Sequence, residues 1–221
     1  LRNTYETYTI MGSCLYAPGL FQICQFLLGF EEAYIKLAIE PEYIKALLEM
    51  IVEREIRAWT DLLLKIGDDL DIAIYTDDFG TQESLIISRD MLKTFFAPHY
   101  KKIFGVIKKL RPGIKIFFHS CGAVFDIIPD LIDMGIDILN PIQVSCKNMD
   151  IAKIKRTFGN DIVLWGGGID TQRVLPCGAK QEISDAVKRA IDVMAPGGGF
   201  VFNAVHAIQP EVPAQNLMAM F

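Results

Sequence analysis

His119 and Cys121 are the residues whose types and spacing point most directly to chemistry. They flank Ser120 at the end of an apolar run that predicts a β-strand, and Gly122 follows them. Residues i and i+2 of a strand point to the same side, so an imidazole and a thiol converge there. Both groups are zinc ligands, and a thiolate favours zinc over harder metals. The pair predicts part of a zinc site; the alternative is a buried histidine beside an ordinary buried cysteine.

His206 is the candidate third ligand. The chain has three histidines, and His206, like His119, follows a predicted strand. In a barrel, the carboxyl ends of all strands face one mouth. With Cys121, the two histidines would leave a fourth tetrahedral position open, as in catalytic zinc sites. The alternative is a structural His206 that hydrogen-bonds the helix start near Pro210, and His99 is expected to be structural.

Two adjacent carboxylates, Asp77 and Asp78, follow another predicted strand. Adjacent residues point to opposite sides of a strand, so we expect them to have different roles. One would face the mouth as a base, a metal ligand or a substrate anchor. The other would cap a helix or bind a neighbouring backbone. Gln82 belongs to the same loop and is expected to line the mouth.

Further candidate binding residues follow the next strands. Asn140 and Gln143 end one predicted strand, and Gly167 and Asp170 lie in the loop after another. Glycine permits close approach of the backbone to a ligand, although a plain tight turn explains a glycine run equally well. We therefore expect these residues to contribute to a cofactor or substrate site.

Two kinds of segment alternate along the chain. Six apolar runs predict strands of a parallel sheet that is covered by helices: Tyr8–Leu15, Asp71–Thr76, Ile114–His119, Asp137–Gln143, Ile162–Trp165 and Phe200–Val205. Helical periodicity marks Pro41–Ile66, Ser88–Leu110, Ile127–Met134, Ile151–Phe158 and Ile183–Met194. The alternation predicts an α/β fold with right-handed crossovers.

The polar strand ends favour a (β/α)8 barrel over a doubly wound sheet. No glycine-rich phosphate loop follows the first strand, which also argues against the doubly wound fold. We expect one domain over residues 1–221. Because a barrel needs about eight strands, the six predicted here indicate the C-terminal two-thirds of an enzyme, with the first strands and the end of the last helix missing.

Composition limits the class of protein and its partners. The 221 residues are 51% hydrophobic, which excludes a disordered or fibrous chain. The net charge of −5, without a basic run, argues against nucleic acid. Five cysteines without a Cys-x-x-Cys pair indicate a reducing, cytoplasmic location. Tyr8–Phe30 is uncharged, but the Pro18-Gly19 turn inside it argues against a membrane span.

These motifs together resemble the uroporphyrinogen decarboxylase superfamily, over a span from Pro18 to Asn216. The superfamily has a (β/α)8 barrel and includes cobalamin-linked, zinc-dependent methyltransferases. That branch carries a His-x-Cys motif, which His119 and Cys121 match here. Its third zinc ligand is a cysteine, and His206 stands at that position in this chain. The resemblance implies zinc and methyl transfer between methylcobalamin on a corrinoid protein and a small thiol or methoxy substrate. Asp77 or Asp78 would orient the substrate or complete the metal shell.

The superfamily also includes the haem-pathway decarboxylase of porphyrin biosynthesis, which lacks His-x-Cys. Its Phe-Asn-x-x-His segment is matched by Phe202, Asn203 and His206, and its loop aspartate by Asp77. Uroporphyrinogen decarboxylation, in which Asp77 stabilises a pyrrole cation, is therefore the alternative. The third hypothesis is a barrel without enzymatic activity that only binds a corrinoid or a tetrapyrrole. The His-x-Cys pair favours methyl transfer, because decarboxylation needs no such metal pair.

Overall fold

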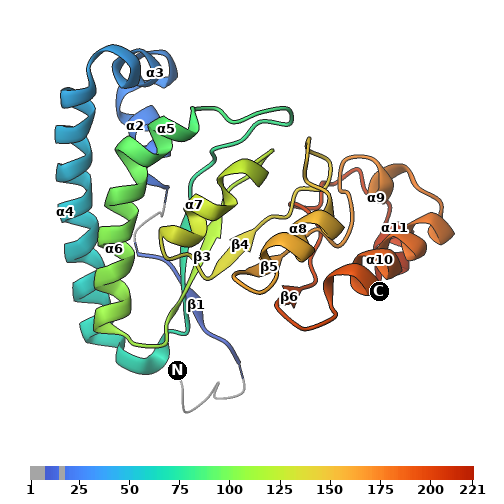
Figure 1. The fold of residues 1–221 in the computed structure, drawn as a ribbon. Helices are drawn as coiled ribbons and strands as arrows, with labels where there is room; N and C mark the ends of the chain where they lie inside the picture. Colours follow the sequence, from blue (N-terminus) through green and yellow to red (C-terminus); the bar gives the residue numbers. More distant parts are fainter. Residues whose placement is uncertain (1–7, 15–17) are drawn as a thin grey trace. The chain divides into compact units, whose positions relative to one another are not determined.

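The computed structural model describes residues 8–14 and 18–221 (Figure 1). Its six strands form a parallel sheet in the order β1-β2-β3-β4-β5-β6, with helices in the connections. The predicted α/β class with six parallel strands is therefore confirmed. The chain divides into two compact units. The first unit consists of Leu1–Asp78, Ile87–His119 and Pro129–Asp137. The second unit consists of Phe79–Ile86, Ser120–Ile128 and Ile138–Phe221.

Three strands belong to the first unit: β1 (Met11–Gly12), β2 (Ile72–Thr76) and β3 (Lys115–His119). Strands β2 and β3 pair in parallel from Ile72 opposite Lys115 to Thr76 opposite His119. The backbone N–H of Asp77 then donates to the carbonyl of His119 at 2.8 Å. The ends of β2 and β3, both of which carry candidate site residues, are therefore level. The predicted strand Tyr8–Leu15 shortens to β1, and residue 15 lies outside the described residues.

The first unit contains the longest helix, α4 (Pro41–Ile66), with the bounds that its periodicity predicts. It buries one stripe of side chains, including Ile44, Leu48, Val52 and Trp59, and packs against α6. The other helical elements of this region are α2 (Leu20–Leu28), α3 (Phe30–Ile39), η1 (Gly67–Asp69), α5 (Arg89–Met91), the π-helical η2 (Leu92–Phe96), α6 (Ala97–Leu110) and α7 (Ile128–Asp133). Ser88 caps α5, since its side chain accepts from the backbone N–H of Met91.

The second unit is built on three parallel strands, β4 (Ile138–Asn140), β5 (Val163–Trp165) and β6 (Phe200–Val201). Its helical elements are η3 (Phe125–Ile127), α8 (Ile151–Phe158), α9 (Val174–Cys177), α10 (Lys180–Met194) and α11 (Ala214–Met220). Helix α10 packs against α8, α9 and α11, as the orange and red part of Figure 1 shows. A buried cluster that includes Ile169, Leu175, Ile183 and Val212 forms the core there.

Two predicted strands are longer than the observed ones. Asp137–Gln143 narrows to β4 because Pro141 follows Asn140 and has no N–H for a ladder. Phe200–Val205 narrows to β6, although single backbone bonds continue along the chain to Val205. Helices α3 and α9 were not predicted, and α11 lies where the last helix was expected, after Pro213. Within residues 8–14 and 18–221, none of the helices has the length and apolar character that crossing a membrane requires.

Candidate metal centre

Ser120 fixes the direction of the two residues beside it. It is fully buried, and its Oγ accepts from the backbone N–H of Phe79 at 3.1 Å. Its own N–H donates to the carbonyl of Asn140 at 2.7 Å. Because neighbouring side chains of an extended segment alternate, an inward Ser120 turns His119 and Cys121 to the other side, where both are partly exposed. The sequence analysis did not predict that Ser120 orients the two candidate ligands; the available signal was its position as a polar residue between them.

Gly122 allows the Cys121 loop to pass against the loop after β2. Its φ of +100° lies in the left-handed region, and a Cβ there would lie 2.3 Å from the carbonyl carbon of Gly80. The N–H of Gly122 donates to Oε1 of Gln143 at 2.7 Å. The N–H of Ala123 donates to the carbonyl of Thr81 at 2.8 Å. Cys121 therefore belongs to a loop that has no room for a side chain at position 122.

The glycine run after β5 positions the segment that leads to His206. The N–H of Gly168 donates to the carbonyl of Asn203 at 2.9 Å, and a Cβ on Gly168 would lie 2.5 Å from the Phe202 ring. The N–H of Val205 donates to the carbonyl of Ile169 at 3.1 Å, and Val205 is buried. Gly168 thus allows close packing against Phe202 and Asn203 of the same chain, and this contact explains the glycine without a ligand. His206 follows Val205 and is exposed.

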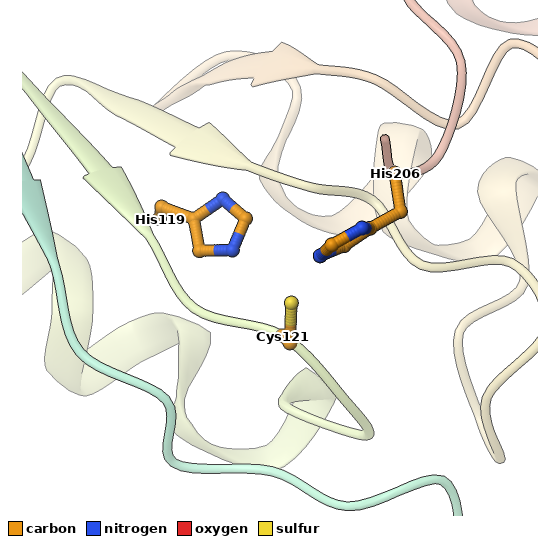
Figure 2. Close-up of side chains that lie close together, drawn as sticks. All are labelled: His119, Cys121 and His206. Atoms are coloured by element: carbon orange, nitrogen blue, oxygen red, sulfur yellow. The ribbon is translucent and has the colours of Figure 1, made fainter. Parts of the chain in front are cut away.

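The three predicted metal ligands lie together. One ligand atom of each of His119, Cys121 and His206 lies within 4.8 Å of the other two, and Figure 2 shows the sulfur and both imidazole rings around one space. Tetrahedral zinc with two nitrogen ligands and one sulfur ligand separates these atoms by about 3.3 to 3.6 Å. Shifts of about 1 Å, within the reach of side-chain rotation, would close the difference. Two imidazoles and a thiol therefore fit zinc in both chemistry and spacing.

A cavity of about 410 Å³ opens beside two of these donors, within the second unit. It is lined by Cys121, His206, Gln143, Thr171, Gln172, Ala207, Gln209 and Glu211. Sequence reasoning placed Gln143 among the binding residues but missed Thr171, Gln172 and Glu211, for which no spacing signal exists. A small molecule in this cavity would lie next to both the thiol and the imidazole.

Asp77 lies in a closed environment. It is fully buried; its Oδ2 accepts from the N–H of Phe21 at 2.8 Å and from the hydroxyl of Tyr100 at 2.6 Å. Its Oδ1 accepts from the N–H of Gln22 at 3.0 Å. Burial away from water raises the pKa of Asp77 to about 7, although all three hydrogen bonds act to lower it. Helix α2 has no side-chain cap from its own N-cap, Gly19, so Asp77 supplies this cap from the end of β2.

Asp78 lies in a more open environment than its neighbour. Its Oδ1 is 3.9 Å from Nε2 of His119, and its Oδ2 accepts from Nε2 of Gln22 at 3.4 Å. Its side chain is 37% exposed, and that of His119 is 26% exposed. Asp77 therefore caps a helix, as expected for one of the two carboxylates, and Asp78 lies beside a metal-ligand candidate; a role of Asp78 toward metal or substrate stays a prediction.

Gln82 and Asn140 bind their own chain. Oε1 of Gln82 accepts from Sγ of Cys146 at 3.2 Å, and the backbone carbonyl of Gln82 accepts from the N–H of Lys147 at 2.9 Å. Asn140 is buried, and its Nδ2 donates to the carbonyl of Trp165 at 3.1 Å. Both residues hold loops at the strand ends, and their predicted roles toward a cofactor stay predictions.

The glycine loop and His99 also have structural contacts. Oδ1 of Asp170 accepts from the N–H of Gln172 at 2.7 Å, which forms a side-chain-to-backbone turn. A Cβ on Gly167 would lie 3.0 Å from Cβ of Ile142, so this glycine is tightly packed. Nδ1 of His99 is 2.6 Å from the carbonyl of Phe95, one turn earlier in the chain, which agrees with the structural role expected for this histidine.

The fold and the site together define an α/β protein of barrel type with a candidate metal centre at the carboxyl ends of its strands. A sequence model of the family described as uroporphyrinogen decarboxylase (URO-D) matches residues 8–221. The chain therefore belongs to the uroporphyrinogen decarboxylase family. No curated protein matches it in sequence.

Solved structures add a similar fold. A methyltransferase from Methanosarcina mazei superimposes with a TM-score of 0.75 at 19% sequence identity, over 99% of this chain. The match covers 59% of the methyltransferase, so this chain spans about three-fifths of that protein's length. At this identity, the likeness establishes the fold and leaves the reaction to be inferred from the site.

Proposed function

We propose that this protein catalyses zinc-dependent methyl transfer between methylcobalamin on a corrinoid protein and a thiol or methoxy substrate. The observation that carries the proposal is the cluster of His119, Cys121 and His206, whose ligand atoms lie within 4.8 Å of one another. Membership of the URO-D family and the fold shared with a methyltransferase support the same reaction class.

His119, Cys121 and His206 would hold the zinc ion and leave one coordination position for the substrate. A bound zinc ion supplies Lewis acidity, which favours a substrate's thiolate at neutral pH or polarises an ether oxygen. The cavity beside Cys121 and His206 gives a small substrate access to that position. Asp78, 3.9 Å from His119, adds negative charge that favours a bound cation.

The methyl group would move between cobalt and the substrate's heteroatom. With a thiol, the sulfur attacks the methyl carbon, a sulfur–carbon bond forms, and the cobalt–carbon bond breaks with its electron pair left on cobalt. The thiol proton passes to solvent. With a methoxy substrate, reduced cobalt attacks the methyl carbon, and the oxygen that leaves takes a proton from solvent. In both directions, a zinc ion held by His119, Cys121 and His206 would supply Lewis acidity to the sulfur or oxygen.

Porphyrinogen decarboxylation is the alternative that the family description supports. It would require Asp77 to face a pyrrole cation. Both carboxylate oxygens of Asp77 accept hydrogen bonds from helix α2, and one also accepts from Tyr100, in a fully buried position. A carboxylate in these contacts would have to leave its helix cap before it could meet a substrate, which favours methyl transfer.

The test is loss of methyl from methylcobalamin in the presence of a thiol, followed by visible absorbance with full-length protein. We expect turnover with zinc-loaded protein and a loss of at least about 100-fold in Cys121→Ala, since the zinc ligand is removed. The matched control is Cys177→Ala, because Cys177 is exposed and lines neither the cluster nor the cavity. Decarboxylation of uroporphyrinogen by metal-stripped protein would overturn the proposal.

A further inference from the structure

We infer that the substrate of this site carries a positively charged group, such as an ammonium, which Glu211 binds, and that an anionic substrate is disfavoured. The inference rests on the proposed function, because it names the class of substrate that would reach the zinc position. It is carried by the residues that line the cavity beside Cys121 and His206, which give that cavity its charge.

The cavity wall, among the described residues that line it, contains one carboxylate, that of Glu211, and neither Lys nor Arg. Its basic side chain is the imidazole of His206, which is a proposed zinc ligand. The remaining polar groups are the amides of Gln143, Gln172 and Gln209 and the hydroxyl of Thr171. Amides and hydroxyls hydrogen-bond neutral and charged groups alike. Apart from the zinc ion, which would bind the substrate's sulfur, the charge preference of the cavity therefore depends on Glu211.

Glu211 is held in place by its neighbours in the chain. The N–H of Val212 donates to the carbonyl of Gln209 at 3.1 Å, which closes a turn around Glu211. The Nε2 of Gln209 donates to the carbonyl of Ala207 at 3.2 Å. Val212 is buried in the core cluster of the second unit. The backbone of Glu211 therefore belongs to a turn, residues 209–212, that Val212 anchors in the core.

The size and charge of the cavity together define the class of substrate. About 410 Å³ suits a small molecule with one reactive sulfur or oxygen and a short charged arm. A thiol bound through its sulfur near Cys121 would have its charged arm in the same cavity that Glu211 lines. An ammonium beside Glu211 gains an ion pair, whereas a sulfonate or carboxylate there meets like charge; the zinc ion acts on the substrate's sulfur and is the same for both.

Calorimetric titration of zinc-loaded full-length protein with three thiols of one length tests this inference. The probes are 2-aminoethanethiol, 2-mercaptoethanol and 2-mercaptoethanesulfonate. We expect the cationic thiol to bind about tenfold more tightly than the anionic one, which corresponds to gaining one exposed charge pair and avoiding one like-charge contact. In Glu211→Gln, this ratio should fall to about twofold.

The variant separates the cavity's charge from the thiols' own acidity, because the thiols are the same in both titrations. Glu49→Gln on helix α4 is the matched control; it removes the same charge from an exposed position that does not line the cavity, and should leave the ratio unchanged. An unchanged ratio in Glu211→Gln, or tighter binding of the anionic thiol by the unaltered protein, would overturn this inference alone. Absence of zinc binding would overturn the proposed function and, with it, this inference.

Discussion

The candidate site residues form two groups, one at the end of β2 and one after β3 and β6, and the groups differ in burial and in hydrogen bonding. At the end of β2, Asp77 is fully buried, and both of its oxygens accept hydrogen bonds. At the end of β3 and after β6, Cys121 is partly exposed and His206 is exposed, and a cavity adjoins both. Saturated and buried polar groups stabilise a fold, whereas partly exposed donors beside a cavity are able to bind a ligand.

A charged residue at a strand end can bind the protein's own backbone, as Asp77 does. Asp77 and Asp78 are adjacent, yet one caps helix α2 and the other lies 3.9 Å from His119. Solvent access and hydrogen-bond saturation distinguish the two positions. We therefore expect changes at Asp77 to lower stability, and changes around Cys121 to lower metal affinity.

The largest effect is expected for Gly122→Ala. Its Cβ would lie 2.3 Å from the carbonyl carbon of Gly80, at a φ of +100°, so the Cys121 loop must move. We expect a loss of more than about 3 kcal/mol in stability, measured by urea denaturation, together with at least about tenfold weaker zinc binding.

Gly113→Ala is the matched control for this prediction. Gly113 has a similar φ of +95°, but nothing lies within 4 Å of its built Cβ. This variant should lose about 1 to 2 kcal/mol from backbone strain and keep its zinc affinity. Equal effects of both variants on zinc would show that the contact with Gly80 does not position Cys121.

Asp77→Ala should be the next most damaging change, at about 3 kcal/mol of unfolding free energy. The substitution removes the acceptor for the first N–H groups of α2 and for the buried Tyr100 hydroxyl. Urea denaturation of metal-free protein measures it. Cys121→Ala under the same conditions should lose less than about 1 kcal/mol. A larger loss for Cys121→Ala than for Asp77→Ala would reverse the distinction between the two groups of residues.

The raised pKa of Asp77 predicts a pH dependence with a definite sign. The pKa is about 7 in the folded protein, against an ordinary value of 3.8. Between these values, the folded state holds a proton that the unfolded state has lost, so this group's contribution to stability falls as pH rises. The free energy of unfolding, measured by urea denaturation, should fall by about 2 to 3 kcal/mol more between pH 5 and pH 7.5 in the unaltered protein than in Asp77→Asn. No difference between the two proteins would refute the raised pKa.

Local pattern was enough to predict the helix at Pro41–Ile66, the ends of β2, β3 and β5, and the three ligand candidates. Each depends on residue type and short-range periodicity, which the sequence displays directly. The helix cap by Asp77 could not be predicted in this way, because it joins residues 55 or more positions apart. The approach of Gly80 to Gly122 and the place of Glu211 in the cavity likewise depend on tertiary packing.

The smallest effect is expected for Asp78→Asn. The carboxylate lies 3.9 Å from Nε2 of His119, and both side chains are partly exposed, so water weakens their interaction. We expect about two- to fivefold weaker zinc binding and less than about 0.5 kcal/mol of lost stability. Competition with a chromophoric chelator would measure the affinity. A loss of affinity as large as that of Cys121→Ala would instead make Asp78 a zinc ligand.

The central claim is that His119, Cys121 and His206 bind one zinc ion. The most direct measurement is the zinc content of full-length protein after dialysis, by atomic emission, for the unaltered chain and for His119→Ala combined with Cys121→Ala. We predict one zinc per unaltered chain and none in the double variant, since a single remaining imidazole does not retain zinc. Equal zinc in both proteins, or none in the unaltered chain, would contradict the claim.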